Sequence, residues 1–349
     1  MKKKVTIYDV AEAADVSLAT VSRVINGSNV VKPATRERVL ETIKRLDFKP
    51  NQIARGLATS KTTTIAVVFP QSLFGHVKDM IGGIGDTGRT LDFNIIMYTT
   101  DELGLGNPIE EVIEKVIKSR ADGVVLFNNN CINKEIDLIK KYRIPAVVVG
   151  YKISDEDICS VYVDAKSIAY DMTKQFIEQG KKDICFVRAT QNLVDLNDFA
   201  KGIEEAFKDS GETLPEDYIV DVSNHYEESY PQLKEYFDTH KHDVVLTGYD
   251  KEAVAVVNAA IDHGINVPED MQVVGMMDTS YATICRPPLT TIHVPVYDMG
   301  AIAIRLLTKI LNHEEIDELL GMSGSAFYEE IDEAEVPMHY AFIKRDTTK

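Results

Sequence analysis

The chain has 349 residues, of which 44% are hydrophobic and 27% charged, and its formal net charge is −17. This length exceeds the ~100–200 residues of a typical domain, so we expect two or three folding units. No run of about 18 apolar residues occurs, which excludes a membrane-spanning helix. The basic start is followed by an acidic, amphipathic segment, which argues against an export signal and favours a cytoplasmic protein.

The charge is unevenly distributed along the chain. Residues 1–60 carry 11 Lys and Arg against 6 Asp and Glu, a net charge of +5. Residues 61–349 carry 27 against 49, a net charge of −22. This distribution is typical of a protein that contacts phosphates with one end of its chain. We call residues 1–60 the basic head, and its charge predicts nucleic acid as a partner.

The first predicted elements are two short helices joined by a tight turn. Thr6 is the expected N-cap of a helix over residues 7–14, with Asp9 three residues later as in a capping box. Ser17 caps a second helix over residues 18–26, which ends at Gly27. Two helices with this spacing indicate a helix-turn-helix, whose second helix enters the major groove of DNA.

The outward face of the second helix carries candidate base contacts. Arg23 can make a bidentate contact to guanine, and Leu18, Ala19 and Thr20 can meet methyl groups and base edges. A third helix over residues 34–46 completes a small core. The helical spacing predicts this core to contain Val21, Val24, Ile25, Val39, Leu40, Ile43 and Leu46.

A short potential helix follows Pro50, with Asn51 as its cap. It contains Gly56 and is too short to be stable alone in water. A hinge that becomes helical only on DNA has this character.

The head resembles the LacI/GalR family of transcriptional regulators. The stretch TIYDVAEAADVSLATVSRVINGSNVVKPATRERV and the later KPNQIARGLA match the family pattern almost position for position. The resemblance implies a homodimer on a palindromic operator, with two hinge helices in the minor groove. Leu57 then matches a leucine of the family that wedges between base pairs. The alternative is that Leu57 is a linker residue packed on the rest of the chain, from residue 62 onward. The predicted DNA contacts are Thr6, Tyr8, Ser17, Leu18, Ala19, Thr20, Ser22, Arg23, Asn26, Asn51, Ala54, Arg55 and Leu57.

From Thr62 onward, short apolar runs alternate with amphipathic helical runs, which indicates parallel sheets with helices on both faces. We therefore expect a small all-α helix-turn-helix head (1–49), a hinge helix and linker (50–61), and an α/β periplasmic-binding-protein-like sensor (62–349). The sensor has the length of two doubly wound parallel-sheet lobes, which bind ligands at the carboxyl ends of their strands. The expected strands are Ile65–Phe69, Asn94–Tyr98, Val124–Phe127, Ala146–Val149, Ile184–Val187, Val244–Thr247 and Val273–Met277.

Two stretches, residues 296–309 and 345–349, resemble more specifically the carbon-catabolite regulators of this family. Their corepressor is the phosphocarrier protein HPr, phosphorylated on a serine. The resemblance implies a docking helix that carries Tyr297, Asp298, Arg305 and Lys309. Arg305 and Lys309 are one helical turn apart, so both can reach one phosphoserine dianion. The alternative is a solvated amphipathic helix.

Two departures from the family pattern bear on a small-molecule effector. The segment Gln71–Asp79 lacks the usual Asn-rich, double-aromatic motif. Phe199 stands where sugar- and purine-responsive relatives have an arginine, three residues before Gly202. Asp250 and Asp278 are candidate effector contacts, with helix capping as the alternative. A local operon repressor that responds to a sugar or another small molecule is the alternative function.

The sequence does not predict an enzyme. The eight histidines are scattered, and Gly82–Gly85 lacks the spacing of a phosphate-binding loop, so a tight helix contact is expected there. We therefore predict no catalytic residues, no metal site and no cofactor. An acidic, glycine- and serine-containing segment, residues 313–335, predicts a flexible surface insertion, with a site for a different partner as the alternative. Free buried thiols are expected for Cys131, Cys159, Cys185 and Cys285.

Overall fold

A computed structural model describes residues 5–25, 30–48, 62–71, 78–100, 109–127, 133–150, 152–153, 155, 158–189, 193–312 and 335–349. The chain divides into two compact units, one of residues 1–64 with 120–122 and one of residues 65–119 with 123–349. Within the described ranges, no helix is long and apolar enough to cross a membrane.

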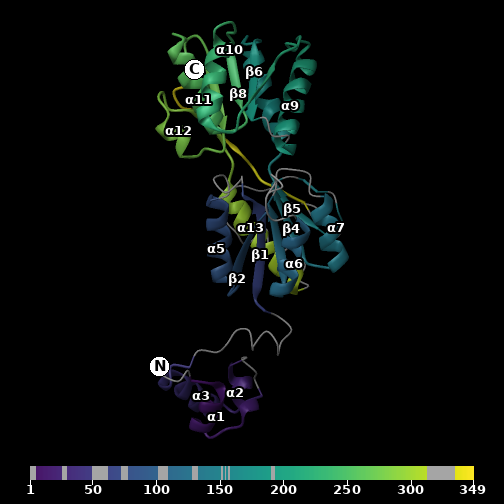
Figure 1. The fold of residues 1–349 in the computed structure, drawn as a ribbon, viewed down its shortest axis with the longest axis vertical. Helices are drawn as coiled ribbons and strands as arrows, with labels where there is room; N and C mark the ends of the chain where they lie inside the picture. Colours follow the sequence, from purple (N-terminus) through teal and green to yellow (C-terminus); the bar gives the residue numbers. More distant parts are fainter. Residues whose placement is uncertain are drawn as a thin grey trace. The chain divides into compact units, whose positions relative to one another are not determined.

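In its described residues, the first unit contains three helices (Figure 1). They are α1 (Ile7–Ala13), α2 (Leu18–Ile25) and α3 (Pro33–Arg45). Pro33 occupies the first turn of α3, where its missing N–H would have no helical partner anyway. The helices lie within a residue or two of those predicted.

The second unit contains two six-stranded sheets, each with its own helices (Figure 1). The first sheet has the order β11-β5-β4-β3-β1-β2 and the second β12-β10-β9-β8-β6-β7. Numbered within each lobe, the first five strands of both sheets follow the doubly wound order 2-1-3-4-5. The strands are β1 (Thr64–Pro70), β2 (Asn94–Thr100), β3 (Gly123–Phe127), β4 (Ala146–Gly150), β5 (Cys159–Tyr162), β6 (Ile184–Ala189), β7 (Ile219–Val222), β8 (Val244–Thr247), β9 (Gln272–Met276), β10 (Thr290–His293), β11 (Glu335–Pro337) and β12 (Ala341–Ile343).

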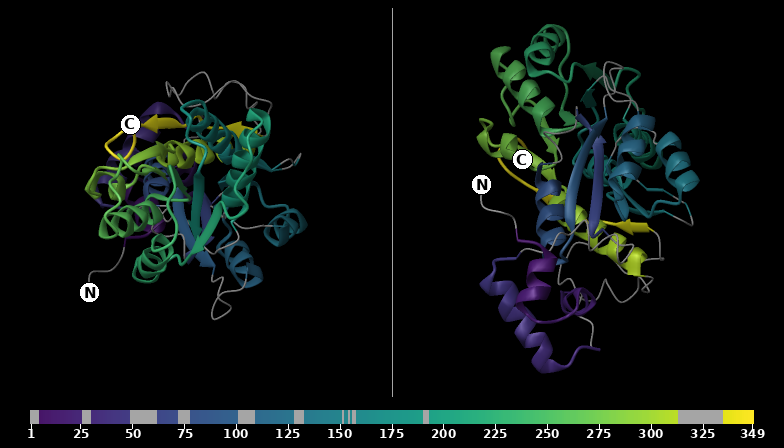
Figure 2. Two further views of the ribbon diagram at one scale, coloured as in Figure 1. Left: turned by 90° about the horizontal axis from the view of Figure 1, so that it is seen from above. Right: turned by 60° about the horizontal axis from the view of Figure 1, so that its bottom comes forward.

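The helices of the second unit separate into two groups. The first sheet is accompanied by α5 (Lys78–Thr90), α6 (Ile109–Ser119), α7 (Asn133–Tyr142) and α13 (Val296–Asn312). The second is accompanied by α8 (Ala165–Glu178), α9 (Val194–Ser210), α10 (Tyr226–Phe237), α11 (Asp250–Asp262) and α12 (Ser280–Ile284). Figure 2 shows α13, in yellow-green, alongside the strands of the first sheet, with which it packs.

The two predicted parallel-sheet lobes are confirmed, with one difference at an edge. Strand β12 pairs antiparallel with β10, through His293 opposite Ala341. Strands β5, β7, β10, β11 and β12, each of three or four residues, were absent from the prediction. The chain passes between the sheets after β5, after β10 and after β11, so the two lobes are joined by several short segments.

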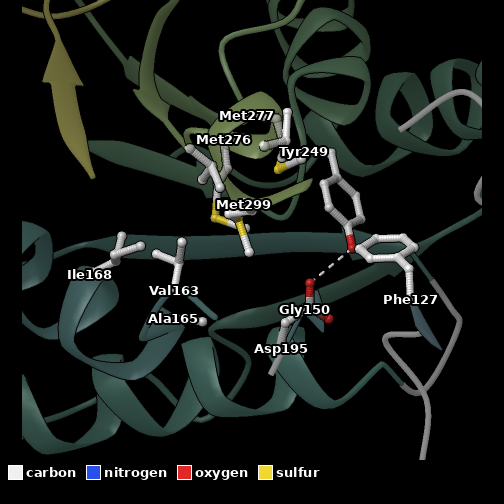
Figure 3. A pocket seen from close by; sticks show the side chains of 12 residues that line it. Phe127, Gly150, Val163, Ala165, Ile168, Asp195, Tyr249, Met276, Met277 and Met299 are labelled. Atoms are coloured by element: carbon white, nitrogen blue, oxygen red, sulfur yellow. Dashed lines mark hydrogen bonds between the residues drawn. The ribbon is translucent and has the colours of Figure 1, made fainter. Parts of the chain in front are cut away.

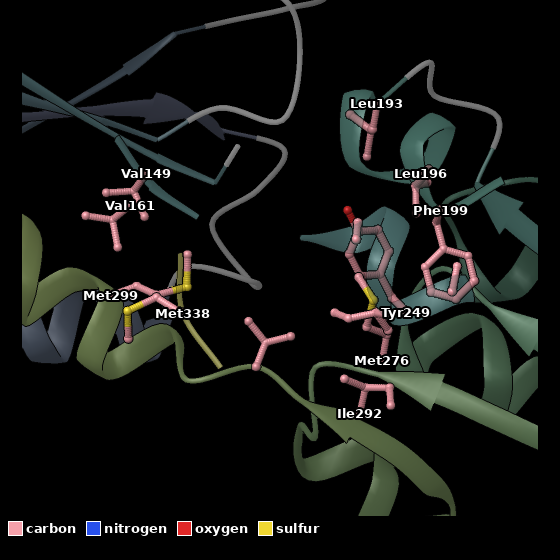
Figure 4. Packing of buried hydrophobic residues seen from close by; sticks show 14 of the residues in the cluster. Val149, Val161, Leu193, Leu196, Phe199, Tyr249, Met276, Ile292, Met299 and Met338 are labelled. Carbon is pink, nitrogen blue, oxygen red and sulfur yellow. The ribbon is translucent and has the colours of Figure 1, made fainter. Parts of the chain in front are cut away.

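One hydrophobic cluster extends through both lobes (Figure 4). Val149, Val161 and Met299 belong to the first lobe, whereas Phe199 and Ile292 belong to the second. The strand residues in this cluster have exposed fractions below 10%. Strands that are buried on both faces need apolar residues throughout, which explains the continuous apolar runs in the sequence.

Candidate functional site

Both predicted caps of the helix-turn-helix are present. The backbone N–H and the hydroxyl of Thr6 donate to the Asp9 carboxylate at 2.7 and 2.6 Å. The Ser17 hydroxyl oxygen accepts the backbone N–H of Thr20 at 3.2 Å. These bonds satisfy groups at the starts of α1 and α2 that have no partner within their helix, so the start of each helix is set by local sequence.

The core of the head is small and consists mainly of alanine and valine. Val10, Val21 and Val39 have no exposed surface. Leu40, which we expected in this core, is 50% exposed, so that expectation is wrong. A helix turns by about 100° per residue, and burial of Val39 directs Leu40 away from the core. Thr42 is buried in its place, and its hydroxyl donates to the Arg38 carbonyl at 2.9 Å.

The predicted DNA contacts that the structure describes lie on α1, α2 and the turn before α2. Tyr8 is 69% exposed and Leu18 39% exposed. Ala19 and Arg23 are also exposed, whereas Ser22 is half-buried. This arrangement leaves one face of α2 accessible for a groove. The other predicted contacts Asn26, Asn51, Ala54, Arg55 and Leu57 lie outside the described residues, as does the hinge over 50–61.

The helix predicted to dock a corepressor is α13, and its first turn packs closely on α5. The Tyr297 hydroxyl donates to the Asp86 carboxylate at 2.8 Å, and this bond raises the pKa of the Tyr297 phenol. A Cβ added at Gly83 would lie 1.9 Å from the Tyr297 carbonyl oxygen. A Cβ added at Gly300 would lie 2.4 Å from the Met80 carbonyl oxygen. The predicted tight helix contact at Gly82–Gly85 is therefore confirmed.

The four candidate docking residues differ in how far they are exposed. Tyr297 is 45% exposed, and Asp298 and Arg305 are half-buried. Lys309 is only 8% exposed, so Arg305 is the more accessible cation for a phosphate on the surface of another protein. Most of the neighbouring segment 71–79 lies outside the described residues.

The two candidate effector carboxylates hold other segments of the second lobe. Asp250 accepts the backbone N–H and hydroxyl of Thr279 at 2.6 and 2.8 Å, and the hydroxyl of Thr291 at 2.5 Å. Burial raises its pKa to about 6, although these hydrogen bonds act in the opposite direction. Asp278 pairs with Arg345 at 2.7 Å, which holds the C-terminal segment. These contacts give both carboxylates a structural role in joining segments of the second lobe.

A small pocket lies where strands of both sheets end (Figure 3). Phe127 ends β3 and Gly150 ends β4, whereas Tyr249 follows β8. The Tyr249 hydroxyl donates to the Asp195 carboxylate at 3.0 Å. We did not single out Asp195 or Tyr249 from the sequence, although Tyr249 follows β8 and Asp195 lies in the first turn of α9, which follows β6. Phe199 is not among the residues that line the pocket; it is buried and stacked on Phe186.

Comparison with known proteins agrees with this architecture. Residues 6–51 match the model of bacterial regulatory proteins of the lacI family, and residues 173–319 match that of a periplasmic binding protein-like domain. Catabolite control protein A of Priestia megaterium is 36% identical over 317 residues, which cover 90% of this chain and 94% of that protein. The chain belongs to the lacI family.

Two further relatives extend the comparison. Catabolite control protein A of Staphylococcus xylosus is 37% identical over 317 residues, again 90% of this chain and 94% of that protein. A crystal structure of the lac repressor dimer, bound to operator and the anti-inducer ONPF, has a TM-score of 0.82 and 21% identity. The match covers 99% of each chain, and it confirms the fold class.

Membership of the lacI family makes the chain a DNA-binding transcriptional regulator, in agreement with the prediction from its head. This is a family of non-enzymatic proteins, so the chain is not an enzyme. Among the residues that the structure describes, no three His, Cys, Asp or Glu side chains are grouped as a metal site would require.

Proposed function

We propose that this lacI-family regulator controls carbon-catabolite genes and uses seryl-phosphorylated HPr as its corepressor. The similarity to two proteins named catabolite control protein A, over nine tenths of the chain, carries this proposal. The accessible side chains on α13 are consistent with it, since Tyr297 and Arg305 present a phenol and a guanidinium for docking. A guanidinium binds a phosphate dianion through paired hydrogen bonds.

In the proposed mechanism, a homodimer binds a palindromic operator with one α2 in each major-groove half-site. The corepressor binds the sensor and shifts its lobes, and this brings the two hinges together in the minor groove. The coupling is reciprocal, so operator DNA tightens corepressor binding by the same factor. Leu57 wedges between central base pairs and stabilises the kinked duplex.

The decisive experiment is a fluorescence-anisotropy titration onto a catabolite-type palindromic operator. Seryl-phosphorylated HPr should tighten binding, and unphosphorylated HPr should not. Arg305→Ala should lose this response, because it removes the more accessible cation of the docking helix. Lys208→Ala removes an exposed positive charge from α9 and serves as the matched control. An operator affinity that is the same with and without phosphorylated HPr would contradict the proposal. An affinity that changes with a sugar instead would identify a local operon repressor.

The role of Leu57 has its own test. Leu57→Ala should weaken binding to the operator while leaving binding to unrelated DNA largely unchanged, because backbone contacts alone hold non-specific DNA. An equal loss on both DNAs would remove the wedge role.

A further inference from the structure

Asp122 holds the segment at which the sensor begins. It lies between α6 and β3, one residue before the strand. Its Oδ1 accepts the backbone N–H of Thr62 at 2.9 Å, and its Oδ2 accepts the backbone N–H of Thr64 at 3.3 Å. In return, the Asp122 backbone N–H donates to the Thr64 carbonyl oxygen at 2.7 Å. Both oxygens of one carboxylate therefore bind the chain directly after the hinge and linker predicted over residues 50–61.

The Thr62 side chain strengthens this attachment. Its hydroxyl donates to the Arg120 carbonyl oxygen at 2.7 Å and makes a longer contact with Asp122 Oδ1 at 3.3 Å. The next residue, Thr63, has a φ of 50°, in the left-handed region that a β-branched residue rarely adopts, and Arg120 has a φ of 55°. Such conformations are unfavourable by themselves and persist where surrounding contacts enforce them. These contacts therefore fix one path for the chain as it enters β1.

The residue after Asp122 lies in a closely packed part of the first lobe. A Cβ added at Gly123 would lie 2.7 Å from Leu307 Cδ1 on α13 and 3.0 Å from the Pro145 carbonyl oxygen. Strand β3 also pairs with β1 on one side and with β4 on the other. The start of β3 has little room to shift by itself, because packed interiors leave few voids. We therefore expect Asp122 to move only together with the strands and the helix around β3.

We propose that Asp122 is a positioning residue for operator binding, because it fixes the point at which the hinge joins the sensor. A dimer must place two recognition helices at half-sites whose separation and rotation are set by the DNA helix. The fewer positions the two attachment points can take, the less conformational entropy is lost when both helices are seated. Without the Asp122 carboxylate, the backbone N–H groups of Thr62 and Thr64 lose their acceptor, and the heads sample more positions. This inference rests on the dimeric mechanism proposed above, but not on the identity of the corepressor.

Operators with altered spacing separate positioning from stability. Two base pairs inserted at the centre of a palindromic operator rotate one half-site against the other by about 70°, since B-DNA has roughly 10–10.5 base pairs per turn. The wild type should bind the spaced operator at least roughly tenfold more weakly than the original. Asp122→Ala should bind the original operator roughly tenfold more weakly than the wild type does, and should lose less than about threefold more on the spaced operator.

Fluorescence anisotropy measures each affinity, without and with phosphorylated HPr, at a temperature where every variant is folded. Affinity for unrelated DNA should agree within about twofold between Asp122→Ala and the wild type, because contacts to the DNA backbone do not depend on half-site spacing. A variant that had only lost stability would not change its preference for one spacing over another.

Three further variants make the test specific. Thr62→Val removes the hydroxyl and leaves the backbone N–H bound to Asp122, so it should give a smaller loss in the same direction. Asp122→Asn keeps one acceptor oxygen and should restore part of the spacing preference that Asp122→Ala loses. Asp137→Asn, at an exposed position of α7 in the same lobe, is the matched control and should behave like the wild type.

The outcomes distinguish this inference from the mechanism on which it rests. A wild type that binds the palindromic operator no more tightly than unrelated DNA, in either condition, would overturn the dimeric mechanism and this inference with it. If the wild type prefers the operator and Asp122→Ala has the same affinities for both spacings as the wild type, the inference alone is overturned. An equal loss in Asp122→Ala on the operator, the spaced operator and unrelated DNA would also overturn it.

Discussion

The head and the sensor place their polar side chains in opposite ways. In the head, the core consists mainly of alanine and valine, and the predicted DNA contacts Tyr8 and Arg23 lie at the surface. In the sensor, Asp195, Asp250 and Glu252 are buried, and burial raises the pKa of each. A change on the head surface should therefore alter binding with little effect on folding. A change inside the sensor should alter stability and its dependence on pH.

The largest change in the free energy of unfolding is expected where α5 packs closely on α13. Gly83→Val should lower the free energy of unfolding by roughly 3 kcal/mol, because its side chain would overlap the backbone of α13 at Tyr297. Gly85, two residues later in α5, has no heavy atom within 4 Å of an added Cβ. Gly85→Ala should therefore stabilise the helix by about 0.5–1 kcal/mol. Denaturant unfolding measures both, and equal effects would contradict the packing argument.

The next effect concerns a buried acid of the sensor. Both carboxylate oxygens of Glu252 are buried without a hydrogen-bond partner among the described atoms, and burial raises its pKa to about 7 from 4.5. Because the folded state binds this proton more tightly, unfolding should become harder as the pH falls from about 8 to 5. Glu252→Gln should remove much of this dependence and stabilise the protein at pH 8 by about 3 kcal/mol.

The control for Glu252 is Glu235→Gln, on the exposed face of α10. It should leave the pH dependence of the unfolding free energy unchanged. Asp195 and Asp250 have pKa values raised to about 6, so a shallower pH dependence should persist in Glu252→Gln. If Glu252→Gln and the wild type had the same slope between pH 8 and 5, the argument from burial would fail.

On the head, Arg23→Ala should change recognition and not folding. A lost bidentate contact to guanine costs about 1–3 kcal/mol of operator binding and relaxes the preference at one base pair. Lys44→Ala removes an exposed charge from α3 and should leave base preference intact. Binding to a set of operators with single base changes measures this. An unchanged preference in Arg23→Ala would mean that Arg23 contacts only phosphate.

The smallest effect is expected at Leu40. Its side chain is half exposed, so Leu40→Ala should change the unfolding free energy by less than about 0.5 kcal/mol. Val39→Ala, one residue earlier and fully buried, should cost roughly 1–3 kcal/mol. Thermal unfolding of the two variants compares adjacent positions in one helix. A larger loss at Leu40 would show that its side chain has an apolar partner in the assembled protein.

The sequence by itself determined the features that depend on short-range patterns. The caps at Thr6 and Ser17 follow from side chains that reach backbone groups three residues away. The apolar runs of β1, β3 and β4 also predicted two parallel-sheet lobes, because such strands are buried on both faces. The glycines at 82–85 likewise indicated a close helix contact before its partner helix was known.

Tertiary structure alone decided which groups from distant parts of the chain meet. The pairing of Asp195 with Tyr249 joins residues 54 positions apart, and that of Tyr297 with Asp86 joins residues 211 apart. The burial of Lys309 and the exposure of Leu40 depend equally on which helix face is covered. Local periodicity indicates that a helix has an apolar face. How much of that face is buried depends on the elements that pack against the helix, and the whole fold determines which elements those are.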